Sequence, residues 1–227
     1  MILADSLING FLGSNLMGRG IVIVQLLGSI IMVATIIGKA KELGFLSLAT
    51  RRFLRDFATS RDSLDYYMER RPSALTGIVG IYKETCERLM KLLGSDRSAA
   101  LTAREIELVR GTCEHVLDEE EIRVERGMGV ISTVVALSPM LGLLGTVWGV
   151  LDAFAEMGTA GSANLATIAP SISAALVTTV VGLLIAIPGV IAFNRMNATI
   201  TTINSEMEGF ADELIGRIAC EFQGRGA

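Results

Sequence analysis

Three long runs without a charged residue dominate the chain. They cover residues 20–38, 127–151 and 157–194. About 20 apolar residues of helix cross the hydrocarbon core of a bilayer, so the first two runs are each long enough for one span. The third run has 38 residues, which would be about 57 Å of continuous helix and too long for one crossing. Because it opens with small and polar residues, we expect its span to cover residues 168–193.

These runs divide the chain into apolar and polar segments. A short turn over 152–167 joins the second and third spans, which should therefore be antiparallel neighbours in a transmembrane hairpin. The expected fold class is an all-α membrane protein with three transmembrane helices and long cytoplasmic helical extensions. The other segments are an amphipathic amino terminus (1–19), a cytoplasmic helical domain (39–126) and a cytoplasmic helical tail (194–227). For the amino terminus, disorder is the alternative to a helix at the membrane interface.

The basic residues predict the orientation of the spans. Of the 20 lysines and arginines, 16 lie between Lys39 and Arg126 and three follow Asn194, whereas the 152–167 turn has none. Basic residues close to a span favour the cytoplasmic side. We therefore expect a multi-pass membrane protein whose amino terminus and hairpin turn face the outside, with its middle loop and tail in the cytoplasm.

The polar segments carry helix signals. Thr102 and Glu105 have capping-box spacing, and Gly94 is placed to end an earlier helix. No proline or cap follows Thr102 before the second span, so we expect one long helix to run into that span. The tail has one apolar seam at helical spacing, which predicts a helix that packs into a cytoplasmic bundle: Ile200, Ile203, Met207, Phe210 and Leu214.

Composition agrees with a membrane protein and excludes several other classes. The chain is 51% hydrophobic and has 24 glycines, as expected for close helix contacts in a bilayer. We expect Cys86, Cys113 and Cys220 to be reduced thiols in helix contacts, and His115, the only histidine, to bind no metal. The sequence has no nucleophile–base pair, no phosphate loop and no basic, aromatic groove pattern. We expect no enzyme activity, no cofactor and no nucleic-acid partner.

Small and hydroxyl-bearing residues follow the faces of the hairpin helices. The small residues either pack the hairpin together or pack neighbouring subunits of a ring. The hydroxyls either bond their own helix backbone or line a polar path. The expected packing residues are Gly142, Gly145, Gly149, Ala175, Gly182, Pro139 and Pro188, and the expected pore-lining residues are Thr146, Thr179, Thr178, Ser138 and Ser173.

Two motifs make the sequence recognisable. The segment SPMLGLLGTVWGV, residues 138–150, resembles the second-span signature of the TolQ/ExbB family, which is related to the flagellar stator protein MotA. The segment ALVTTVVGL, residues 175–183, with the Ala169-Pro170 pair before it and Ala186-Ile187-Pro188 after it, is similar to the family's third-span signature. The order of the predicted spans, loop and tail also resembles that family.

The resemblance implies a multi-pass motor subunit of the bacterial inner membrane, driven by the proton gradient, with the amino terminus and the 152–167 turn in the periplasm. Five copies of such a subunit form a ring around the membrane helices of a two-copy, single-span partner of the TolR/ExbD type, and an aspartate of the partner carries the proton. Thr146 and Thr179 match the family's pore-facing threonines. This chain departs from the family at Ala174, where the family usually has glutamate, so a mechanism that needs that carboxylate is in doubt.

The placement of charged residues agrees with a proton-carrying carboxylate that belongs to another chain. None of the three spans contains an ionisable residue, although a proton relay normally needs one, so the titrating group would come from another chain. Outside the spans, acidic residues could form an anionic vestibule at each mouth of a ring: Glu119 and Glu120 on the cytoplasmic side, Asp152 and Glu156 on the periplasmic side. For the run 118–121, a solvated helix face paired with Arg123 and Arg126 is the alternative.

Two functions remain open from the sequence. The first is a ring subunit of a proton-driven motor in contact with membrane lipid and its single-span partner. The second is a non-conducting membrane scaffold that organises partner proteins, which the missing glutamate at position 174 keeps open.

Overall fold

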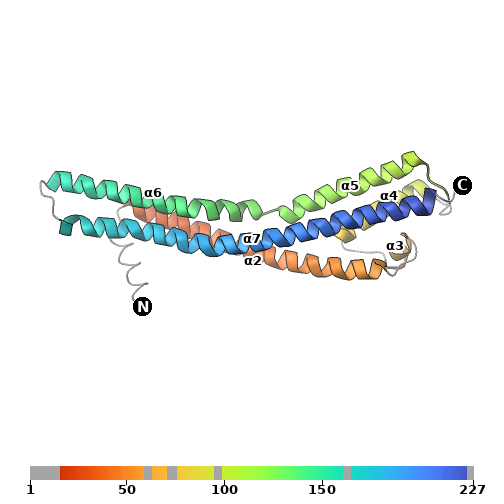
Figure 1. The fold of residues 1–227 in the computed structure, drawn as a ribbon, viewed down its shortest axis with the longest axis horizontal. Helices are drawn as coiled ribbons and strands as arrows, with labels where there is room; N and C mark the ends of the chain where they lie inside the picture. Colours follow the sequence, from red (N-terminus) through yellow and green to blue (C-terminus); the bar gives the residue numbers. More distant parts are fainter. Residues whose placement is uncertain (1–15, 59–62, 71–75, 95–98, 161–164, 224–227) are drawn as a thin grey trace. The chain divides into compact units, whose positions relative to one another are not determined.

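The computed structural model describes residues 16–58, 63–70, 76–94, 99–160 and 165–223, and every regular element among them is an α-helix. The predicted amino-terminal helix falls mostly outside these residues. The helices, drawn in Figure 1, are α2 (Leu16–Ala58), α3 (Asp65–Arg70), α4 (Ile78–Leu93), α5 (Ala103–Glu125), α6 (Met128–Ala160) and α7 (Leu165–Gln223). The expected all-α class is confirmed.

The chain forms two compact units. The membrane unit comprises residues 1–39 and 127–195, and the extramembrane unit comprises residues 40–126 and 196–227. The divisions lie within two residues of the ends of the uncharged runs. Each unit therefore combines segments that are far apart in the sequence.

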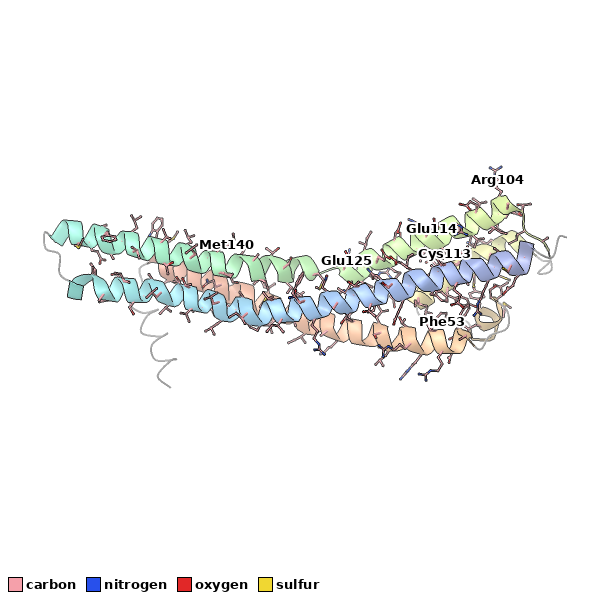
Figure 2. All side chains as sticks on the ribbon, viewed as in Figure 1. Phe53, Arg104, Cys113, Glu114, Glu125 and Met140 are labelled. Atoms are coloured by element: carbon pink, nitrogen blue, oxygen red, sulfur yellow. The ribbon has the colours of Figure 1, made fainter. Side chains whose placement is uncertain are left out.

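Among the residues that the structure describes, three helical segments are long and apolar enough to cross a membrane, one within each of the ranges Leu16–Ala58, Ala103–Gly158 and Ile168–Phe222. In the membrane unit, α6 lies beside α7 and the first half of α2 (Figure 1). Most of the apolar side chains point outward: Met140, labelled in Figure 2, is 66% exposed and Ile191 is 65% exposed. An apolar surface of this kind is suited to lipid.

The expected continuous helix from Thr102 into the second span is wrong. The α5 helix ends at Glu125, and α6 begins at Met128. Between them, Arg126 has an extended ψ of 132° and Gly127 has a φ of +91°. Only glycine adopts that φ without strain, so Gly127 is the break that the sequence analysis overlooked.

The hairpin turn is shorter than expected. The α6 helix continues past Leu151 to Ala160, and α7 begins at Leu165. Asp152 and Glu156 end the uncharged run, but charge does not end a helix, and the alanine-rich segment around them has good helix propensity. The part of 152–167 that the structure describes is therefore helical.

The helix signals of the polar segments are confirmed. Thr102 caps α5, and its capping box with Glu105 is complete. Gly94, with a φ of 58°, ends α4. The tail seam is buried throughout at Ile200, Ile203, Met207, Phe210 and Leu214.

A buried tyrosine organises the core of the extramembrane unit. Tyr82 is 0% exposed, and its hydroxyl donates to the Ser63 carbonyl at 2.7 Å and accepts from the Tyr67 N–H at 2.9 Å. The rings of Phe53 and Phe57 lie 5.4 Å and 5.5 Å from the Tyr82 ring, a spacing at which aromatic pairs attract. Burial raises the pKa of Tyr82, so its hydroxyl stays protonated and able to donate.

The carboxyl-terminal end of α7 closes the same unit. The Glu221 carboxylate accepts from the Ser63 N–H at 2.9 Å and from the Ser63 hydroxyl at 2.6 Å. The Leu101 N–H donates to the Phe222 carbonyl at 3.2 Å. These bonds tie the last turn of α7 to segments before α3 and before α5.

The three cysteines differ in their exposure. Cys86 and Cys113 are buried, as expected, but Cys220 is exposed. Burial raises the pKa of the Cys86 thiol to about 12 and also raises that of Cys113. Since the thiolate is the nucleophile, burial and a raised pKa make Cys86 and Cys113 unreactive near neutral pH, and Cys220 alone of the three is accessible to a thiol reagent.

We therefore expect a maleimide at pH 7.5 to modify Cys220 rapidly and to leave Cys86 and Cys113 unmodified in the folded protein. Mass spectrometry of peptides after timed labelling measures this. Labelling in denaturant is the control, and all three thiols should then react. Modification of Cys86 as fast as Cys220 in the folded protein would contradict the packing described here.

Candidate pore residues and helix contacts of the membrane unit

Three glycines of α6 bring α7 into close contact. A Cβ added at Gly142 would lie 2.8 Å from the Thr179 Cα and 3.0 Å from the Thr178 carbonyl oxygen. A Cβ at Gly145 would overlap the Thr178 side chain, and one at Gly149 would overlap the Ala175 Cβ. These three positions pack the hairpin within a single chain, which is one of the two roles that the sequence left open.

Two threonine hydroxyls join the hairpin helices. Thr178 is 1% exposed, and its single hydroxyl proton is shared between the Ala175 carbonyl, 2.7 Å from the Thr178 Oγ1, and the Gly142 carbonyl, 3.1 Å away. The Thr179 hydroxyl donates to the same Gly142 carbonyl at 2.9 Å. One backbone oxygen of α6 thus accepts from two side chains of α7, which is possible only because Gly142 has no side chain between the helices.

A glutamine of the first span completes the three-helix contact, and the sequence analysis did not single it out. Gln25 is 1% exposed, and its Nε2 donates to the Ser138 carbonyl at 3.0 Å and to the Thr178 carbonyl at 3.3 Å. A Cβ at Gly182 would lie 2.9 Å from that nitrogen. The available signal was that Gln25 is the only side-chain amide in the 20–38 run.

The amide of Gln25 has one defined orientation. Both groups that it meets are carbonyl oxygens, so the amide must present its NH₂ to them. Its Oε1 atom is buried and has no hydrogen-bond partner among the described residues. The contact therefore depends on a donor at this position, and a side chain that only accepts hydrogen bonds cannot replace it.

The remaining hydroxyls lie in different surroundings. Ser138 is 3% exposed, and its hydroxyl donates to the Val134 carbonyl at 2.7 Å. Thr146 is partly exposed and donates to the Leu143 carbonyl at 2.7 Å, whereas Ser173 is exposed. Thr146 and Ser173 thus reach the surface of the single chain, and Thr179 reaches it in part. Thr178 and Ser138 differ from the expectation of pore-lining residues, because both are buried between helices of one chain.

The remaining predicted packing residues also include both buried and exposed positions. Ala175, at 5% exposed, and Gly182 are buried in the three-helix contact, and Pro139 is partly buried. Pro188 is exposed in the single chain. Ala174, the position of the expected family glutamate, is 4% exposed, so a longer side chain there would need space inside the chain.

The predicted vestibule residues are not equivalent. Glu119 is exposed, 3.5 Å from His115. Glu120 is 3% exposed: it pairs with Arg123, and its carboxylate accepts from the Gly77 N–H, at the start of α4, at 2.7 Å. Glu120 therefore stabilises the fold of the extramembrane unit instead of presenting a charge to solvent.

At the other end of the hairpin, Asp152 is partly exposed and Glu156 is exposed. The Glu156 carboxylate accepts from the Ser171 hydroxyl at 3.1 Å, which joins α6 to α7 near the turn. Both carboxylates lie in the part of α6 that continues beyond the uncharged run, as a charged vestibule requires.

The fold and these contacts define a class. The described residues include three helices of membrane length, and small residues and side-chain bonds to backbone carbonyls hold these helices together. Their predicted spans contain no ionisable group. These are the features of a multi-pass membrane protein. No group of three or more potential metal-binding side chains occurs among the residues described.

The chain belongs to the MotA/TolQ/ExbB proton channel family, whose sequence profile matches residues 83–209. Together with its three apolar helices, this membership indicates a multi-pass protein of the bacterial inner membrane.

Individual relatives carry the names of a Tol-Pal system protein and of a biopolymer transport protein. The Tol-Pal system protein TolQ of Haemophilus influenzae is 29% identical over 208 residues, which cover 89% of each chain. TolQ of Pseudomonas aeruginosa is 42% identical over 97 residues, covering 43% of this chain and 42% of the relative. The biopolymer transport protein ExbB of Xanthomonas campestris is 35% identical over 108 residues, covering 48% of this chain and 43% of the relative. The matches to the last two thus span less than half the length of the relative.

Proposed function

We propose that this protein is the ring-forming subunit of an inner-membrane motor that converts proton flow into mechanical work on the cell envelope or into transport. Five copies surround two copies of a single-span partner of the TolR/ExbD type, and the amino terminus lies in the periplasm. The names of the relatives support the kind of machine. The observation that carries the proposal is that this chain belongs to a proton channel family and yet has no ionisable residue in its predicted spans.

The mechanism follows from this absence of charge. A threonine hydroxyl donates and accepts hydrogen bonds but holds no proton charge near neutral pH. The titrating carboxylate is therefore supplied by the partner's membrane aspartate, and Thr146, Thr179 and Ser173 hydrogen-bond that carboxylate or its water. Each proton that falls through 100 mV releases about 2.3 kcal/mol, enough to bias a step between packed helices. Thr178 and Ser138 hold the helices that present this surface.

The exposed charges complete the proposal. Asp152 and Glu156 form an anionic ring at the periplasmic mouth and attract cations there. On the cytoplasmic side Glu119 is available for the same role, whereas Glu120 is committed to Gly77 and Arg123.

Proton flux tests the motor directly. The chain is purified with a single-span partner of the TolR/ExbD type and placed in liposomes that contain a pH-sensitive dye, and a potassium diffusion potential drives the flux. We expect flux that requires both proteins and disappears when the partner's membrane aspartate is changed to asparagine. Proton flux through this chain without the partner would show that the proton-carrying carboxylate does not come from the partner.

The threonines have their own test in the same assay. We expect the double variant Thr146→Ala and Thr179→Ala to conduct about thirtyfold less, since the two lost hydrogen bonds are worth roughly 1 kcal/mol each. Thr133→Ala is the matched control, because Thr133 is exposed on the same helix and bonds only the Gly129 carbonyl at 2.7 Å. Unchanged flux in the double variant would remove both threonines from the path.

A non-conducting scaffold is the second candidate, and Ala174 favours it. An alanine stands where the family usually carries a membrane carboxylate, and its side chain is 4% exposed. A complex that forms with the partner but passes no protons at any applied potential is the result expected of a scaffold.

A further inference from the structure

The exposed face of α2 in the extramembrane unit is an apolar and basic stripe. Phe45 is 75% exposed and Leu48 is 60% exposed. The opposite face of the same helix packs into the unit through Leu46, Phe53 and Phe57. The α2 stripe recurs every three or four residues on the outer face: Lys41, Phe45, Leu48, Arg52 and Arg55. A helix that is already packed on one side thus presents a second seam that nothing in the single chain covers.

Lipid does not account for the whole α2 stripe. The uncharged run ends at Gly38, and Arg52 follows 14 residues later, which is about 21 Å along a helix. Each headgroup layer of a bilayer is only about 5–8 Å thick. Arg52 and Arg55 therefore lie beyond the lipid headgroups if the span ends where its uncharged run ends.

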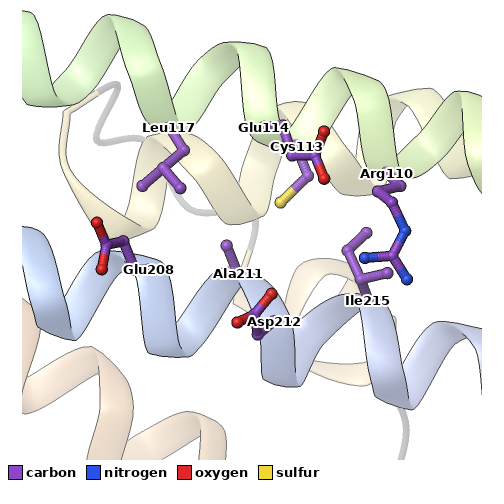
Figure 3. A pocket seen from close by; sticks show the side chains of 8 residues that line it. All are labelled: Arg110, Cys113, Glu114, Leu117, Glu208, Ala211, Asp212 and Ile215. Carbon is purple, nitrogen blue, oxygen red and sulfur yellow. The ribbon is translucent and has the colours of Figure 1, made fainter.

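An acidic groove lies on the same unit, between α5 and α7 (Figure 3). Its volume is about 210 Å³. Figure 3 shows side chains of both helices around it, and apolar ones form part of the lining: Leu117, Ala211 and Ile215, next to the buried Cys113. The charged residues of the lining are Glu114, Glu208, Asp212 and Arg110.

The groove carries an excess of negative charge. Arg110, its only cation, lies 3.7 Å from Glu107 on its own helix. No ion pair neutralises Glu114, Glu208 or Asp212 within the residues that the structure covers. Next along α5, the pKa of Glu121 is raised by partial burial and then by the nearby charges of Glu208, Asp118 and Glu125. Carboxylates thus accumulate here without compensation inside one chain.

We propose that the α2 stripe of one copy docks into the α5–α7 groove of a second copy. Arg52 and Arg55 meet the carboxylates of the groove, and Phe45 and Leu48 cover its apolar lining. The stripe and the groove are different surfaces of the same chain, so the contact is head-to-tail and, when the rotation closes, generates a ring. The inference rests on the proposed ring because it requires several copies of the chain. It adds that a contact outside the membrane holds these copies together.

Charge reversal with rescue tests the contact. The protein, purified in mild detergent with its single-span partner, is weighed by native mass spectrometry. We expect Arg52→Glu with Arg55→Glu to weaken association between copies about tenfold or more, because like charges then face each other across the contact. We expect Glu208→Arg with Asp212→Arg to do the same. All four changes in one chain should restore the wild-type mass.

A matched control keeps the change in net charge constant. Lys91→Glu with Arg104→Glu reverses two exposed cations of α4 and α5 that belong to neither surface, and it should leave the mass unchanged.

A second measurement avoids detergent. In a Cys220→Ser background in native membranes, oxidation should give a ladder of linked copies when Leu48→Cys and Leu117→Cys are combined, and none with either change alone.

The outcomes separate this inference from the proposed function. A monomeric wild-type protein would overturn the ring itself. An oligomeric wild type whose mass neither charge reversal alters, and whose paired cysteines do not link, would overturn only this contact. Loss of binding to anionic lipid vesicles after Arg52→Glu with Arg55→Glu, at unchanged mass, would reassign the α2 stripe to the membrane surface.

Discussion

Replacing Gly142 by alanine should destabilise the membrane unit by about 1–3 kcal/mol, the usual cost of forcing an extra carbon into a packed contact. The new Cβ would lie 2.8 Å from the Thr179 Cα and 3.0 Å from the Thr178 carbonyl oxygen, and both are backbone atoms that no rotamer change can move. The two helices must separate, and the bonds from the Thr178 and Thr179 hydroxyls to the Gly142 carbonyl then lengthen.

Thermal unfolding of the detergent-solubilised protein measures this effect. Gly129→Ala is the control on the same helix, since a Cβ there meets no atom within 4 Å, and alanine should be neutral or slightly stabilising because of its higher helix propensity. Equal melting temperatures for the two variants would mean that the hairpin helices are further apart than described.

Replacing Gln25 by glutamate should be more damaging than replacing it by leucine, although glutamate is nearly the same shape. Leucine removes the donor to Ser138 and Thr178, a loss of about 0.6–2 kcal/mol for a hydrogen bond between membrane helices. Glutamate at neutral pH turns a carboxylate oxygen toward those same carbonyl oxygens and puts a charge in the span, at a cost of about 2.5–3.5 kcal/mol.

The yield of folded protein in membranes and its melting temperature give the order, which should be wild type, then Gln25→Leu, then Gln25→Glu. Ser29→Ala is the control within the same helix, because the Ser29 hydroxyl bonds only its own helix at the Leu26 carbonyl, 2.8 Å away. A Gln25→Glu variant as stable as wild type would mean that this side chain does not meet the two carbonyls.

The sequence was sufficient for the spans because charge is costly in a bilayer and its absence is easy to see. It was sufficient for the caps and for the tail seam because these depend on local spacing. The sequence did not predict the helix break at Gly127, because nothing in the apolar run distinguishes a glycine with a positive φ from the other glycines there. It also extended the hairpin turn too far, because it treated Asp152 as the end of a helix when only the apolar run ends there.

The site residues were harder to predict than the fold. The motif grouped Thr178 with Thr146, but whether a hydroxyl faces a neighbouring helix or the surface depends on the rotation of α7, which spacing alone does not give. Gln25 was missed because its partners are backbone carbonyls more than a hundred residues away in the sequence. Glu120 belongs to an acidic run whose other members are more exposed, and only the position of Gly77 distinguishes it.

The bonds from Ser63 to Glu221 and from Leu101 to Phe222 have a consequence for biogenesis. Residues 40–126 leave the ribosome before the hairpin helices, but their core lacks its closing helix turn until the chain beyond residue 220 has been made. All three spans are therefore synthesised before the extramembrane unit can be completed, and until then the unfinished part exposes apolar surface that chaperones can bind.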